Sequence, residues 1–157
     1  MKKTLVMYFS ASGTTKMVAE KLAGAVGAEL YELKPAVPYT RADLNWQDQR
    51  SRSSEEMNSP KSRPELSEPA PDVSGYDRLF LGFPIWWYTA PRVVQTFLES
   101  GDFSGKTIVL FATSGSSGLG KTAEDLAKSC PGAKLISGRV FRAGVSADEL
   151  RRWAESC

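Results

Sequence analysis

The stretch Met1–Thr15, MKKTLVMYFSASGTT, decides the fold, because a short apolar run breaks into small hydroxyl residues and a helical pattern follows at once. A nearly continuous apolar run is typical of a strand covered on both faces. The residues after it, Ser10 to Thr15, bring hydroxyls and backbone amides to a helix N-terminus, which carries partial positive charge. The sequence therefore predicts a phosphate-binding loop. No Lys or Arg lies inside it, so we expect dipoles and hydrogen bonds to neutralise the anion.

The composition indicates one globular domain over residues 1–157, with 41% hydrophobic and 24% charged residues. A net charge of +2 gives no strong attraction to nucleic acid or to a membrane surface. There is no run of 18 apolar residues that would predict a transmembrane helix. The N-terminal apolar run is too short for a signal peptide, so we expect a core strand and a cytoplasmic protein.

Histidine is absent, which removes the commonest general base and metal ligand. The two cysteines, Cys130 and Cys157, lack metal-ligand spacing. We therefore expect no metal site, and we expect Cys130 to be a buried thiol before Pro131.

Five segments have strand patterns. Three of them, Leu5–Phe9, Leu79–Phe83 and Ile108–Ala112, are almost continuously apolar, as in the centre of a parallel sheet. Ala28–Leu33 and Lys134–Phe141 mix polar and apolar residues, which suits edge strands.

Helical patterns alternate with these strands. They are the stripe Val18, Leu22 and Val26, a helix from Pro91 to Gly101, a weaker one over Lys121–Ser129, and one capped by Ser146 and Glu149. The alternation predicts a doubly wound α/β fold with helices on both faces of a five-stranded parallel sheet. With the second and fifth strands at the edges, the order 2-1-3-4-5 follows, and its switch point lies between the first and third strands.

Residues 35–71 form an insert after the second strand, rich in proline and charge and poor in apolar residues. This composition favours a mobile polar loop. Trp46 and Met57 are large apolar exceptions that could anchor a lid, so we also predict that the insert folds over the site or forms a docking surface.

Three unusual loops follow the central strands, and in a parallel sheet such loops converge on one crevice. They are Ser10–Thr15, Pro84–Pro91 (PIWWYTAP) and Thr113–Gly120 (TSGSSGLG). The row Trp86-Trp87-Tyr88 cannot all enter one core, so at least one ring should face the crevice, where a planar ligand could stack on it.

The segments YFSASGTTKMVAEKLA, GFPIWWYTAPRVVQTFLE and FATSGSSGLG resemble flavodoxins, in particular the bacterial short-chain, flavodoxin-like group with a PIWW loop. The insert residues DLNWQDQRSRSSEEMNSPKSRPEL resemble the insert of the same group, so the resemblance covers nearly the whole chain. It implies a flavodoxin-like fold, bound FMN and electron transfer with redox partner proteins. The group is expected to have glycine where this chain has Tyr88, and familiar electron carriers are more acidic.

The resemblance also implies the cofactor-binding residues. The phosphate would lie against Ser10, Ala11, Ser12, Gly13, Thr14 and Thr15, and the flavin ring between Pro84, Ile85, Trp86, Trp87 and Tyr88 on one side and Thr113, Ser114, Gly115 and Gly118 on the other. It implies no catalytic side chain, because the flavin performs the redox chemistry.

Two alternatives remain open. An NAD(P)H-dependent FMN or quinone oxidoreductase would have the same cofactor site, and the near-neutral charge and Tyr88 favour it. The segment Gly115–Thr122, GSSGLGKT, also matches the phosphate loop of NTPases. However, it follows the fourth strand, and no central strand ends in the Asp that such a site needs to hold Mg²⁺.

Overall fold

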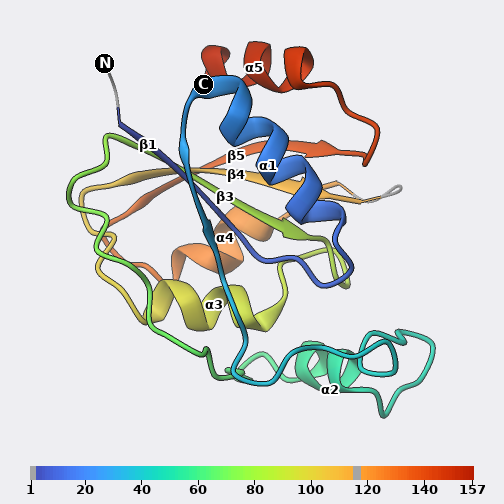
Figure 1. Ribbon diagram of the computed structural model, residues 1–157. Helices are drawn as coiled ribbons and strands as arrows, with labels where there is room; N and C mark the ends of the chain where they lie inside the picture. Colours follow the sequence, from blue (N-terminus) through green and yellow to red (C-terminus); the bar gives the residue numbers. More distant parts are fainter. Residues whose placement is uncertain (1–2, 115–117) are drawn as a thin grey trace.

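The computed structural model describes residues 3–114 and 118–157, and its five strands form one parallel sheet in the order β2-β1-β3-β4-β5 (Figure 1). The strands are β1 Thr4–Tyr8, β2 Glu29–Glu32, β3 Arg78–Pro84, β4 Thr107–Thr113 and β5 Lys134–Phe141. The helices are α1 Thr14–Val26, α2 Arg52–Asn58, α3 Arg92–Glu99, α4 Thr122–Ala127 and α5 Ala147–Ser156. The predicted strand order and edge strands are confirmed.

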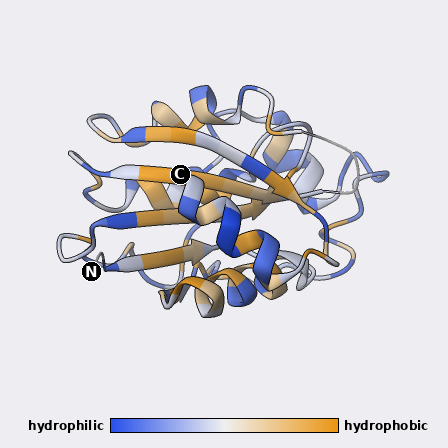
Figure 2. Cartoon of the chain, turned by 90° about the horizontal axis from the view of Figure 1, so that it is seen from above, coloured by the Kyte–Doolittle hydropathy of each residue, from blue (hydrophilic) through white to orange (hydrophobic). Residues whose placement is uncertain are grey.

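Two apolar cores sandwich the sheet, one on each face. Alternate residues of the central strands enter them, because successive side chains of a strand point to opposite faces. The first core packs Met7 and Leu110 against α3 and α4, and the second packs Val6 and Phe111 against α1 and α5. Figure 2 shows the apolar colouring concentrated along the strands. Each fully buried Leu, Val or Phe contributes roughly 1.5–3 kcal/mol, so the central strands form a rigid base for the loops above them.

Local hydrogen bonds determine where α5 begins and where α4 ends. The Ser146 hydroxyl accepts a hydrogen bond of 3.1 Å from the Glu149 amide, which confirms the predicted cap of α5. The prediction for α4 was too long at its end, because the amides of Ser129 and Cys130 bond three residues back, to Leu126 and Ala127, in a tighter turn. Cys130 is buried, as predicted.

The insert contains more regular structure than the polar loop that its composition favours. It contains α2, whose Met57 is only 6% exposed, and it lies against α3 (Figure 1). The Arg92 guanidinium on α3 donates to the Met57 carbonyl at 2.9 Å, and Arg63 in the insert pairs with Glu99 on α3 at 2.9 Å. These links use charged and backbone groups, so a count of apolar residues could not reveal them.

Within the described ranges, no helix combines the length and apolar character needed to cross a membrane.

Candidate functional site

Backbone hydrogen bonds hold the carboxyl ends of four strands together. The Phe9 amide donates to the Gly82 carbonyl at 2.9 Å, and the Ile85 amide donates to the Thr113 carbonyl at 3.1 Å. The Ser114 amide reaches the Phe141 carbonyl at 3.3 Å. The three predicted loops therefore start from one rigid edge.

The Ser10–Thr15 loop turns into α1 through Gly13, whose φ of +97° is a left-handed conformation that suits glycine. The Gly13 amide bonds to the Ser10 hydroxyl at 3.1 Å, which closes the loop. Gly13 offers no side-chain cap to α1, and the first turn of Thr14–Val26 has no acidic residue. The amides at the start of α1 are thus arranged to receive an anion.

Thr15 and Thr113 support this loop from below. Their hydroxyl oxygens lie 2.7 Å apart and join the start of α1 to the end of β4. Thr15 is only 1% exposed. The buried Thr15 hydroxyl therefore supports the loop, whereas Ser12 and Thr14 line a pocket.

That pocket has a volume of about 460 Å³ and lies between the α1 loop and the ends of β4 and β5. It is lined by Ser12, Thr14, Thr113, Ser114, Phe141, Arg142 and Ala143. The sequence analysis missed the last three, although they too follow a strand at its carboxyl end. Arg142 adds a cation to a site that we expected to rely on dipoles and hydroxyls alone.

The aromatic loop forms a tight turn in which Trp86 and Thr89 exchange backbone hydrogen bonds of 2.9 and 3.1 Å. Trp87 and Tyr88, at its centre, have φ values of +50° and +65°. Trp86 is half-buried and packs edge-on against Phe9 and Tyr39, with centroids 5.9 and 5.4 Å away. Trp87 and Tyr88 are 40% and 76% exposed. Trp86 therefore anchors the turn, and the next two rings face solvent.

Replacing Tyr88 with glycine is expected to raise the free energy of unfolding by about 1 kcal/mol, because left-handed φ values strain non-glycine residues. The exposed ring loses little packing. Urea denaturation of the protein without ligand measures this change, and Tyr88→Ala, which keeps the strain, is the matched control. A loss of stability in Tyr88→Gly would show that the ring stabilises the turn.

The third loop meets the aromatic turn. A Cβ atom on Gly120 would lie 3.7 Å from the Tyr88 carbonyl oxygen, and the Thr89 hydroxyl bonds to Asp125 on α4 at 2.6 Å. Gly118 is exposed, and Gly115 lies outside the described residues. The Thr122 hydroxyl is fully buried and donates to the Leu119 carbonyl, so it is not presented to a Mg²⁺ ion as the NTPase interpretation requires.

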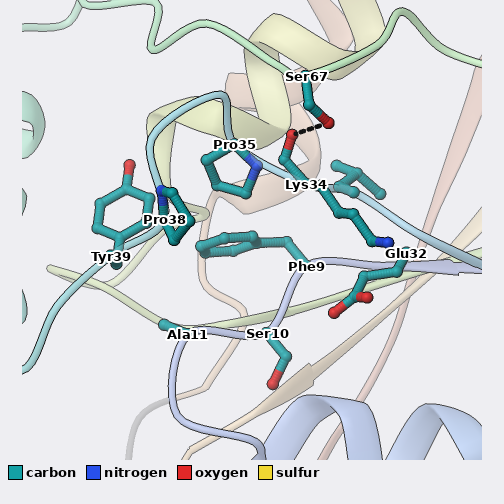
Figure 3. Close-up of a pocket in the computed structure, with 10 residues that line it drawn as sticks. Phe9, Ser10, Ala11, Glu32, Lys34, Pro35, Pro38, Tyr39 and Ser67 are labelled. Atoms are coloured by element: carbon teal, nitrogen blue, oxygen red, sulfur yellow. Dashed lines mark hydrogen bonds between the residues drawn. The ribbon is translucent and has the colours of Figure 1, made fainter.

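A second pocket of about 370 Å³ lies on the β2 side of the site (Figure 3). Its lining includes Ser10 and Ala11 of the predicted phosphate loop. Figure 3 shows Tyr39 on one side of the Phe9 ring and Glu32 and Lys34 on the other. Two pockets that flank the start of the α1 loop are thus lined in part by six of the predicted site residues, Ser10, Ala11, Ser12, Thr14, Thr113 and Ser114.

Trp46, the predicted anchor of the insert, is 69% exposed and lines a hollow formed by residues 41–47 of its own loop. Tyr39 takes the inner position that we expected of Trp46. It packs against both Phe9 and Trp86.

A parallel sheet of this order, with helices on both faces and an uncapped helix start after its first strand, defines a flavodoxin-like α/β protein. The family model for flavodoxin matches residues 3–157, and the chain belongs to the flavodoxin family. A search of curated proteins gave no match.

Solved structures of flavoproteins are similar to this chain over nearly its whole length. A candidate flavoprotein from Bacteroides eggerthii is 47% identical, with a TM-score of 0.91 over 99% of this chain and 98% of that one. Another, from Bacteroides uniformis, is also 47% identical, with a TM-score of 0.91 over 98% of each chain. A flavoprotein from Lactobacillus acidophilus, solved in complex with FMN, is 25% identical, with a TM-score of 0.69 over 98% of this chain and 99% of that one.

Proposed function

We propose that this protein binds FMN without a covalent bond and carries electrons between redox partner proteins. The observation that carries the proposal is the start of α1, where amides without a side-chain cap adjoin the Ser12 and Thr14 side chains of the 460 Å³ pocket. A phosphate monoester fits this donor set, because amides and hydroxyls donate to its oxygens and the helix dipole favours its charge. The family and the FMN complex of the Lactobacillus acidophilus protein support the same cofactor.

The flavin ring would lie beside the Trp86–Thr89 turn, with Trp87 and Tyr88 as the rings free to stack on it. Both have substantially exposed side chains, whereas Trp86 is held by Phe9 and Tyr39. The Ser114 and Gly118 end of the third loop would approach the other edge. Bound FMN supplies the electron transfer, and the chain's residues bind it, orient it and limit its contact with water.

The alternative, an NAD(P)H-dependent FMN or quinone oxidoreductase, is favoured by the net charge of +2, since docking of a carrier usually relies on a charged surface. A steady-state assay separates the two roles. Turnover with NAD(P)H and a quinone, without another protein, supports the enzyme. Reduction only in the presence of a reductase partner supports the carrier. We propose a cytoplasmic location for either role.

Replacing Arg142 with glutamine is expected to weaken FMN binding about threefold to tenfold at low salt, because an exposed cation contributes modestly. Binding of riboflavin, which lacks the phosphate, should not change. Arg139→Gln is the matched control, because Arg139 lies three residues earlier, on β5, and pairs with Glu149 on α5 at 3.0 Å. Titrations at low and high salt measure the effect, and an equal loss for both flavins would contradict it.

A further inference from the structure

The insert contacts the Trp86–Thr89 turn through Tyr39. The Tyr39 ring lies 5.4 Å from Trp86 and 5.6 Å from Phe9, edge-on in both pairs. Since Phe9 also contacts Trp86 at 5.9 Å, the three rings form a closed cluster. Phe9 follows β1, Trp86 follows β3, and Tyr39 is the member contributed by the insert. Edge-to-face pairs have a preferred geometry, so such a cluster fixes ring orientation as well as position.

Two charged residues of α2 hold Tyr39 in turn. The Tyr39 hydroxyl donates to the Glu56 carboxylate, and the Arg52 guanidinium lies 3.8 Å from the Tyr39 ring centre. Arg52 also pairs with Glu56 at 2.9 Å and donates to the Val37 carbonyl at 2.7 Å. Burial, followed by the hydrogen bond to Glu56, raises the pKa of Tyr39, so its hydroxyl remains a donor at neutral pH.

The position of α2 is itself fixed. Arg92, on the helix that follows the aromatic turn, donates to the Glu56 and Met57 carbonyls at the end of α2. The chain of contacts from α3 to α2, then to Tyr39 and Trp86, is therefore continuous. Such a chain limits the movement of the Trp86–Thr89 turn, and its natural effect is to pre-organise the surface on which a planar ligand stacks.

We propose that Tyr39, held by Arg52 and Glu56, is a positioning residue that orients Trp86 and with it the flavin-binding turn. This inference rests on the proposed FMN site and assigns the insert a role within it. The insert would then act as a fixed wall of the site rather than as a lid that closes over it.

The test compares Tyr39→Leu, which keeps apolar bulk, with Tyr39→Phe, which keeps the ring. Tyr39→Leu should weaken FMN binding about tenfold and shift the absorption bands of bound FMN, because two ring contacts with the turn's anchors are lost. Tyr39→Phe should restore most of the affinity and the wild-type spectrum. A purely structural role would lower stability without shifting the spectrum.

Tyr31→Leu is the matched control. The Tyr31 hydroxyl also bonds to a carboxylate of the insert, Glu68, but its ring packs against Phe97 on α3. This variant should change FMN affinity by less than about twofold, since it leaves the turn's anchors in place. Wild-type affinity and spectrum in Tyr39→Leu, or an equal loss in Tyr31→Leu, would overturn the proposal.

A double-mutant cycle separates this proposal from that of FMN binding. Tyr39→Leu and Trp86→Leu, alone and together, are unfolded with urea in the absence of flavin. The two changes should be non-additive, because their rings are in contact. If wild-type protein fails to bind FMN but the cycle shows coupling, only the proposed function fails. Additive effects would overturn the positioning role, and Tyr39→Phe with Trp86→Phe gives a milder cycle if the leucine variants do not fold.

Discussion

Replacing Thr14 with glutamate is expected to weaken FMN binding about 100-fold while leaving the protein folded, because the new carboxylate would lie close to the bound phosphate. Thr14 is the first residue of α1 and lines the 460 Å³ pocket. An acidic residue in this position favours the helix itself by about 0.3–1 kcal/mol. The variant should therefore unfold at the same or a higher urea concentration.

Riboflavin provides the comparison for this variant, because it has the same ring and no phosphate. Its affinity should change by less than about threefold, since screening limits the effect of the charge beyond the phosphate subsite. Ser74→Glu is the matched control, as Ser74 is exposed near the amino end of β3, at the opposite end of the sheet. Equal losses for both flavins in Thr14→Glu would place the phosphate elsewhere.

Replacing Gly138 with alanine is expected to destabilise the fold by about 3 kcal/mol, the upper end of typical overpacking costs. Leu110 pairs with Ser137 and Phe111 with Arg139, so Gly138 is the extra residue of a bulge in β5. A Cβ atom there would lie 2.0 Å from the Leu110 carbonyl oxygen and 2.7 Å from the Trp153 ring. The backbone oxygen cannot rotate away, so the strand must move.

Urea denaturation of the two alanine variants Gly138→Ala and Gly24→Ala checks this expectation. Gly24 lies within α1, and a Cβ atom there would meet nothing within 4 Å. Alanine should stabilise that helix by about 0.5–1 kcal/mol. Comparable stability of the two variants would show that β5 yields at the bulge without significant cost.

Much of the fold could be predicted from the sequence, because the pattern of apolar residues in a segment indicates how far that segment is buried. The continuous apolar runs of β1, β3 and β4 are typical of central strands, the mixed runs of β2 and β5 suit edges, and the observed order agrees. With that order, the three loops had to meet at one edge of the sheet. The same argument should have included the residues after β5, where Arg142 lines the pocket.

The contacts of the insert could not be predicted in this way. Arg92 and Arg63 attach it through a backbone carbonyl and a carboxylate, which leave no periodic pattern. Tyr39 is one of several large residues in the insert, and only the tertiary structure shows that it reaches Trp86 while Trp46 faces solvent. Likewise, the left-handed turn at Trp87 and Tyr88 contradicts residue preference, so these two residues do not themselves predict it.

The most direct test of an FMN site at the start of α1 is a pair of equilibrium titrations of the wild-type protein, with FMN and with riboflavin, followed by quenching of flavin fluorescence. We predict one FMN per chain and an affinity at least about 100-fold higher for FMN than for riboflavin, since the loop would bind the phosphate through several charge-assisted hydrogen bonds. No quenching, or equal affinity for the two flavins, would contradict the proposed site.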